Sequence, residues 1–157
     1  MIKIVGLGPG SIDALTIGTM EVLKNSKNTF LRTSIHPTAQ YLKEKGYKFE
    51  TYDDFYQNGE SFEEVYNAIA EDIIKKDSKL GNLVYAVPGH PLVAEKSVVN
   101  IIKLCRENNI EYEIVPAVSF IDVLMERLEI DPINGLKIID AFDIKNQIKI
   151  GRAHVWT

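Results

Sequence analysis

Three short turns in this sequence combine glycine, proline and small polar residues in a pattern that suits the binding of a small molecule. Residues 6–10 read Gly-Leu-Gly-Pro-Gly, residues 88–91 read Pro-Gly-His-Pro, and residues 116–119 read Pro-Ala-Val-Ser. Glycine lets a backbone approach a ligand closely or take a positive φ, and proline stiffens the chain beside it. We therefore expect these turns, more than any charged cluster, to build the site.

Each turn directly follows an apolar run that is typical of a buried strand. The runs cover residues 2–7, 83–87 and 112–115, and a helical pattern follows each turn. In open α/β sheets, ligands bind beyond the carboxyl ends of the strands. If the three strands are neighbours in one sheet, the turns that follow them converge on a single cleft.

The rest of the chain alternates between strand and helix patterns, which is typical of βαβ units with a parallel sheet. We therefore expect an α/β fold, with a parallel sheet flanked by helices and a polar loop over 53–60. The predicted strands cover 2–7, 28–31, 47–52, 82–87, 112–115 and the start of one at 135–141, and the predicted helices cover 14–23, 36–45, 61–76, 93–106 and 121–128.

Composition excludes several classes of protein. The chain has 157 residues and a net charge of −4, without the basic stripe of a nucleic-acid binder. No apolar run approaches the roughly 20 residues that span a bilayer. The first four residues lead directly into a strand, which predicts no signal peptide. Together with a single cysteine, Cys105, this indicates a cytoplasmic protein with neither nucleic-acid nor membrane partners.

The first glycine turn also resembles part of the dinucleotide fingerprint G-x-G-x-x-G. Gly6 and Gly8 match it, but Ser11 stands where the third glycine belongs, and Pro9 lacks an amide that a pyrophosphate would use. The second strand ends at Arg32, where a ribose-binding acid is expected. Because an arginine there could meet a 2′-phosphate, an NADP-binding reductase remains an alternative.

Other reactive side chains form weaker patterns. His36, His90 and Cys105 lack the spacing of metal ligands, so we expect no metal site. Ser119, His90 and Asp122 could be imagined as a catalytic triad. No Gly-x-Ser-x-Gly elbow surrounds Ser119, so we interpret this trio as a chance combination.

Two adjacent carboxylates, Asp53 and Asp54, stand among aromatic residues after the third predicted strand. Carboxylate pairs can act as general acid and base when their pKa values are pushed apart. On a polar loop they are more often solvated or form the rim of a substrate site. The sequence leaves these interpretations open and assigns no catalytic residue.

In order and spacing, the three turns resemble the tetrapyrrole (corrin/porphyrin) methylase family of S-adenosylmethionine-dependent methyltransferases. The family opens with a strand and Gly-x-Gly-Pro-Gly, which residues 6–10 match. Its Gly-Asp-Pro turn is matched by residues 89–91, with His90 in place of aspartate. Its Pro-Gly-Val-Ser turn is matched by residues 116–119, with Ala117 in place of glycine. The resemblance covers residues 1–149.

The resemblance implies the fold and the ligands. The fold would be the N-terminal lobe of a two-lobed methylase domain, and S-adenosylmethionine would lie between the lobes, beside a small-molecule methyl acceptor. The acceptor would meet Gly8, Pro9 and Gly10. The residues that the resemblance places on the cofactor are Leu7, Gly89, His90, Pro91, Val93, Ser119 and Phe120.

The two departures from the family pattern support an alternative function. Replacing aspartate by His90 removes a carboxylate acceptor from the pocket, and a protonated histidine would repel a sulfonium. Ala117 has a Cβ where the family has none, which narrows backbone freedom. A non-catalytic ligand-sensing or assembly domain is therefore the main alternative to a methyltransferase.

The resemblance also implies how the chain is divided. Residues 1–116 would form the first lobe and residues 117–149 the start of a second, truncated lobe. Residues 150–157 have neither periodicity nor a cap, and we interpret them as an artefactual tail. The motif at residues 88–95 resembles a bacterial subgroup in which the methylase-like domain is fused to a MazG-type nucleoside triphosphate pyrophosphohydrolase. At full length we expect a homodimer.

Overall fold

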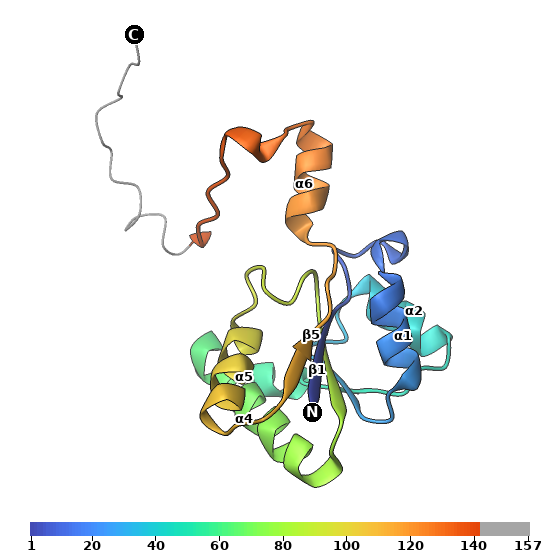
Figure 1. Cartoon of the computed structure of the whole chain (residues 1–157), viewed down its shortest axis with the longest axis vertical. Helices are drawn as coiled ribbons and strands as arrows, with labels where there is room; N and C mark the ends of the chain where they lie inside the picture. Colours follow the sequence, from blue (N-terminus) through green and yellow to red (C-terminus); the bar gives the residue numbers. More distant parts are fainter. Residues whose placement is uncertain (142–157) are drawn as a thin grey trace, which may run out of the picture.

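Strands β1 and β4 lie side by side at the centre of a parallel sheet with the order β3-β2-β4-β1-β5 (Figure 1). The computed structural model describes residues 1–141. Every residue of β4 is buried, because helices cover both faces of the central strands. The predicted α/β fold is confirmed. The strands are β1 (Ile2–Gly6), β2 (Thr29–Leu31), β3 (Glu50–Thr51), β4 (Leu83–Val87) and β5 (Tyr112–Ile114).

Helices α1 and α2 pack on one face of the sheet, and α4 and α5 pack on the other (Figure 1). The alternation of side chains along each strand produces these two cores. In β1, for example, Ile4 joins the core under α4 and α5, and Val5 joins the core under α1 and α2. The helices are α1 (Ile17–Asn25), α2 (Pro37–Glu44), α3 (Asp53–Asn58), α4 (Phe62–Leu80), α5 (Lys96–Glu107) and α6 (Phe120–Leu128), with 3-10 turns at Ile12–Ala14 and Pro132–Asn134.

Two predicted elements are wrong. The segment predicted as a polar loop contains the short helix α3, because Phe55 packs edge-on against the buried ring of Tyr52, with the ring centroids 5.0 Å apart. Residues 135–141 form no strand. A strand requires a neighbour for its ladder of hydrogen bonds, and the described part of the chain offers none at that position.

Helix α6 projects from the carboxyl edge of the sheet, away from the other helices (Figure 1). None of its residues is buried except at its cap, and Phe120, Leu124 and Leu128 are each about half exposed. The predicted boundary at residue 116 falls between β5 and α6, and it stays a prediction. The predicted segments 142–149 and 150–157 lie outside the described residues.

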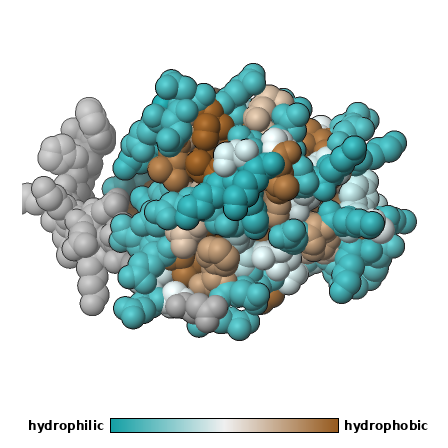
Figure 2. All heavy atoms as spheres, turned by 90° about the horizontal axis from the view of Figure 1, so that it is seen from below, coloured by the Kyte–Doolittle hydropathy of each residue, from teal (hydrophilic) through white to brown (hydrophobic). Residues whose placement is uncertain are grey.

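The amino-end face of the molecule carries mostly hydrophilic side chains, with apolar ones scattered among them (Figure 2). Within residues 1–141, no helix is both long and apolar enough to cross a membrane.

Candidate functional site

Gly6, the last residue of β1, is the point where the three predicted turns meet. A Cβ at this position would overlap the carbonyl oxygen of Gly89, and it would lie 2.5 Å from the Cβ of Ala117 and 2.9 Å from the Cδ of Pro91. The three turns are in contact because their strands are adjacent in the order β4-β1-β5. The predicted convergence on one place is therefore confirmed, and only glycine leaves room for it.

Backbone hydrogen bonds join the first two turns directly. The amide of Gly89 donates to the carbonyl of Gly8 at 2.8 Å, and the amide of Gly8 donates back to Gly89 at 3.3 Å. Both glycines have left-handed φ values, +72° for Gly8 and +66° for Gly89. We call Gly6, Gly8, Gly89 and Ala117 the glycine junction. The amides of Gly8 and Gly89 hold the first two turns together, so the surface left for a ligand is the open side of Gly89.

The space beside the α-carbon of Gly89 is open, and the space beside that of Gly8 is not. No atom lies within 4 Å of the position that a Cβ would occupy on Gly89, whereas a Cβ on Gly8 would come within 3.0 Å of the carbonyl oxygen of Ala14. A ligand can therefore approach the backbone of Gly89 without meeting a side chain. This observation fits a cofactor held against main-chain atoms.

The third turn is fixed by the start of α6. The hydroxyl of Ser119 accepts hydrogen bonds from the amides of Ile121 and Asp122, and the Asp122 carboxylate accepts from the Ser119 amide at 2.7 Å. The hydroxyl of Ser119 also donates to the Asp122 carboxylate at 2.7 Å, and this bond and the one from the Ser119 amide outweigh slight burial and lower the pKa of Asp122. Ser119 and Asp122 thus form a capping box, which explains their proximity without a catalytic triad.

His90, which stands where the resemblance expects an aspartate, makes the kind of local turn that an aspartate makes. Its Nδ1 accepts a hydrogen bond from the amide of Leu92 at 3.0 Å, and its carbonyl accepts from the amide of Val93 at 3.1 Å. An aspartate side chain accepts from a backbone amide two residues on in the same way. The bond from Leu92 therefore occupies the Nδ1 lone pair of His90.

The remaining predicted residues fall into two groups. The side chain of Leu7 is fully buried in the core under α1 and α2, its amide donates to Val87 and its carbonyl accepts from Thr38, so it shapes the turn from below. The other residues are at least partly accessible at the carboxyl edge, namely Pro9, Gly10, Val93 and Phe120.

At this edge lies a second group of residues whose contact with one another was not predicted from the sequence. Arg32, at the end of β2, places its Nε 3.1 Å from Oε2 of Glu95, although the N–H is not aimed for a hydrogen bond. Its Nη1 donates to the hydroxyl of Tyr56 at 3.2 Å. Ser97 donates to Oε1 of Glu95 at 2.7 Å, and its Oγ lies 2.8 Å from the hydroxyl of Tyr85, which must then be the donor. We call these five residues the Arg32 cluster.

The charged groups of the Arg32 cluster are largely shielded from solvent. The side chain of Glu95 is only 6% exposed and that of Arg32 is 22% exposed. Burial raises the pKa of Glu95, although Arg32 and Ser97 act in the opposite direction. Burial alone would lower the pKa of Arg32, but Glu95, Tyr56 and Tyr85 together outweigh burial and raise that pKa. Arg32 therefore stays charged, whereas burial makes the carboxylate of Glu95 easier to protonate than an exposed glutamate.

The position and partners of Arg32 bear on the alternative that the protein is an NADP-binding reductase. Arg32 does stand at the carboxyl end of β2, where a 2′-phosphate would be met. Glu95 already neutralises it, however, and Tyr56 occupies one of its terminal nitrogens. The geometry therefore disfavours the role of Arg32 as a phosphate ligand.

Asp53 holds the segment that carries Arg32. It accepts hydrogen bonds from the hydroxyl of Thr33, the amide of Ser34 and the hydroxyl of Ser34, at 2.5, 2.9 and 2.6 Å. Partial burial would raise the pKa of Asp53, but these hydrogen bonds outweigh it and lower that pKa. A carboxylate with a lowered pKa and several donors is suited to a structural role and poorly suited to general acid or base chemistry.

His36 ends the same segment, beside the first glycine turn. Its Nδ1 is buried and has no hydrogen-bond partner in the part of the chain that the structure describes. Burial and the positive charge of Arg32 lower the pKa of His36, and the backbone of Gly8 acts in the opposite direction. Within residues 1–141, no three His, Cys, Asp or Glu residues come together in a way that could hold a metal ion.

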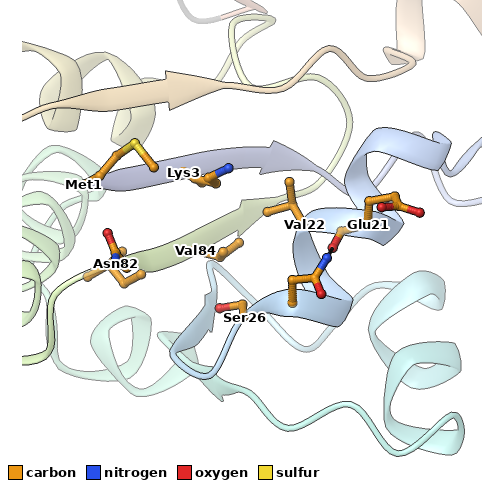
Figure 3. A pocket seen from close by; sticks show the side chains of 9 residues that line it. Met1, Lys3, Glu21, Val22, Ser26, Asn82 and Val84 are labelled. Atoms are coloured by element: carbon orange, nitrogen blue, oxygen red, sulfur yellow. Dashed lines mark hydrogen bonds between the residues drawn. The ribbon is translucent and has the colours of Figure 1, made fainter.

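A hollow of about 460 Å³ lies at the opposite, amino-terminal edge of the sheet (Figure 3). Met1 and Lys3 line it from β1 and the residue before it, Asn82 and Val84 line it near the start of β4, and Glu21 in the middle of α1 lies at one side. It is separated from the glycine junction by the length of the central strands. It therefore plays no part in the candidate site.

A model of the Tetrapyrrole (Corrin/Porphyrin) Methylases matches residues 1–156 of this chain. The chain belongs to this family. Among its relatives is the uncharacterized protein YabN of Bacillus subtilis (strain 168), with 38% identity over 140 residues. This match covers 89% of the chain but only 28% of YabN.

Solved structures of tetrapyrrole methylases share the fold. Uroporphyrin-III-C-methyltransferase from Thermus thermophilus superposes with a TM-score of 0.62 at 20% identity, over 83% of this chain and 53% of that chain. The same enzyme complexed with S-adenyl homocysteine gives a TM-score of 0.56 at 18% identity, over 76% of this chain and 48% of that chain. The tetrapyrrole methylase chain described here thus spans about half of the length of these enzymes.

Proposed function

We propose that the intact protein is an S-adenosylmethionine-dependent methyltransferase whose first lobe contributes the glycine junction to the cofactor site. The observation that carries this proposal is the open, left-handed backbone of Gly89 at the place where three strand ends meet. Family membership and the relative that was solved with S-adenyl homocysteine support it. In this proposal Leu7 supports the turn from below, and the cofactor is lined by Gly89, His90, Pro91, Val93, Ser119 and Phe120.

The chemistry follows from the residues at this edge. S-adenosylmethionine supplies a methyl group on a positively charged sulfonium, which an electron-rich carbon or nitrogen of the acceptor takes by in-line displacement. The residues of this chain bind and orient the two molecules, and Gly8, Pro9 and Gly10 face the acceptor. Alignment of the reacting atoms supplies much of the acceleration. No side chain needs to act as a nucleophile.

Binding of S-adenosylhomocysteine to the intact protein, measured by calorimetry, tests the cofactor proposal. Gly89→Arg should abolish binding, because the new side chain fills the open space beside residue 89. Gly46→Arg is the matched control, since Gly46 also has a positive φ and no atom within 4 Å of its Cβ position. The absence of heat with the unaltered protein, or equal loss in both variants, would count against the proposal.

A non-catalytic sensor is the second candidate, and His90 is the observation that favours it. The Nδ1 of His90 is already bonded to the amide of Leu92, so this side chain offers a ligand less than a carboxylate would. A sensor would bind S-adenosylhomocysteine without transferring a methyl group. Incubation of the intact protein with methyl-labelled S-adenosylmethionine and cell extract separates the two, because only a methyltransferase moves the label to an acceptor.

We also propose that the intact protein is a cytoplasmic homodimer with a C-terminal MazG-type pyrophosphohydrolase domain. The resemblance at residues 88–95 supports the fused domain, and a relative as long as YabN, of which this chain spans 28%, has room for one. The downstream coding sequence tests this directly. A second α/β lobe followed by a helical segment rich in paired glutamates is expected, and the oligomeric state follows from light scattering.

A further inference from the structure

We propose that Glu95, acting through Arg32, is the positioning residue that fixes the cofactor-binding turn at residues 89–94. This inference rests on the proposed function. The turn is tied at its first end by the hydrogen bonds between Gly89 and Gly8. Its second end runs directly into α5, where the carbonyl of Glu95 accepts from the amide of Val99, and the link from there to the end of β2 is the carboxylate of Glu95, held by Arg32 and Ser97.

The backbone is strained at Ala94, the residue just before Glu95. Ala94 has a φ of 55°, in the left-handed region that non-glycine residues with a Cβ seldom adopt. Strained residues of this kind persist only where surrounding contacts hold them, and they cluster at ligand sites. The contacts that follow Ala94 are those of Glu95, so the ion pair holds the turn in its present shape.

Burying this ion pair costs desolvation free energy, so a gain in stability alone does not account for it. Desolvation raises the pKa of Glu95, which means that the folded protein carries the charged carboxylate at a cost. Replacing both members of a buried ion pair by hydrophobic residues of similar volume is often neutral or stabilising. The geometric consequence of the pair is more specific, since Arg32 joins the end of β2 and Tyr56 of α3 to the turn after β4.

The titratable groups facing Glu95 are few. Arg32 faces it from the end of β2, Tyr56 from α3 and Tyr85 from β4, while Ser97 of α5 donates a hydrogen bond without titrating. The pKa of each tyrosine is raised by burial, so both stay neutral near pH 7. Protonation of Glu95 on acidification is therefore the event that removes the anchor.

The double variant Arg32→Gln with Glu95→Gln, made in the intact protein, tests the proposal. A positioning role predicts an unchanged Tm and on the order of tenfold weaker binding of S-adenosylhomocysteine, because a displaced turn loses alignment with its ligand. Binding by the unaltered protein should also weaken as the pH falls through the raised pKa of Glu95, above 4.5, and the variant should lack this dependence. Glu113→Gln, which breaks the exposed ion pair with Lys3, is the matched control and should change neither quantity.

A parallel fall in Tm and affinity, or equal affinity in variant and unaltered protein, would overturn the proposal while leaving the cofactor assignment intact. If the unaltered protein fails to bind, the cofactor assignment falls, and hydrogen exchange without ligand then decides the positioning role. The amides of Leu92 and Val93 should exchange faster in the variant, and the amide of Leu7, bonded to Val87, should not change. Unchanged exchange at residues 92 and 93 would refute it.

Discussion

The glycine junction and the Arg32 cluster hold the two ends of the same turn, and they use different forces. At Gly89 the turn is held by backbone hydrogen bonds and by close packing against Gly6, where no side chain fits. At Glu95 it is held by a buried ion pair and hydroxyl groups. The first end has no titratable side chain and leaves no room for a Cβ on Gly6, whereas the second end depends on charge.

The largest expected effect comes from Gly6→Ala, which adds one carbon to the glycine junction. The new Cβ overlaps the carbonyl oxygen of Gly89 and crowds Ala117, so the turns must separate. We expect a loss of about 3 kcal/mol in the free energy of unfolding, at the upper end of overpacking effects. Urea denaturation measures it.

The control for this change is Gly89→Ala. Its Cβ meets no atom within 4 Å, so the only cost is the left-handed φ of +66°, about 1 kcal/mol. If the two variants were equally stable, the contact between the turns would not hold the junction, and the contrast with the Arg32 cluster would fail.

A smaller effect is expected on the charged side from Asp53→Ala. This change removes the acceptor of three hydrogen bonds from Thr33 and Ser34, which hold the segment after Arg32. Because the carboxylate is partly exposed, we expect a loss of about 1 kcal/mol at neutral pH. Chemical denaturation measured across a range of pH values provides the readout.

The pH dependence has a definite sign. Since the folded pKa of Asp53 is lowered, its contribution is present above its ordinary value of 3.8 and is lost as the pH falls through the lowered value. The difference between the variant and the unaltered protein should therefore shrink in acid. Glu63→Ala, which removes an acidic residue from the first turn of α4, controls for the helix dipole and should cost less.

The smallest expected effect is a gain in stability from Ala94→Gly. Glycine removes the penalty of the left-handed φ of 55°, and its greater freedom in the unfolded chain offsets part of this, which leaves a gain of about 0.5 kcal/mol. Asn82→Gly is the control, because asparagine tolerates its φ of 43° better than alanine would. A loss of stability in Ala94→Gly would mean that the turn is not strained at this residue.

The sequence by itself determined the alternation of strands and helices, the three turns and the family. Apolar runs and the residues Gly8, Gly89 and Ser119 are local signals, because strand burial, positive φ and helix capping act over a few residues. The strand 135–141 and the polar loop 53–60 were predicted wrongly, because a strand needs a partner and α3 depends on the packing of Phe55 against Tyr52.

Only the tertiary structure decided which strands are neighbours, and hence that Gly6 is the contact point of all three turns. It also decided that Arg32, Tyr56 and Glu95 form one buried cluster, although up to 63 positions separate them in the chain. No pattern of residue types in the sequence indicates that these three side chains meet. Their charges become buried and paired only when distant strand ends come together. The physical reason is that sheet order, which sets these neighbours, is a property of the whole chain.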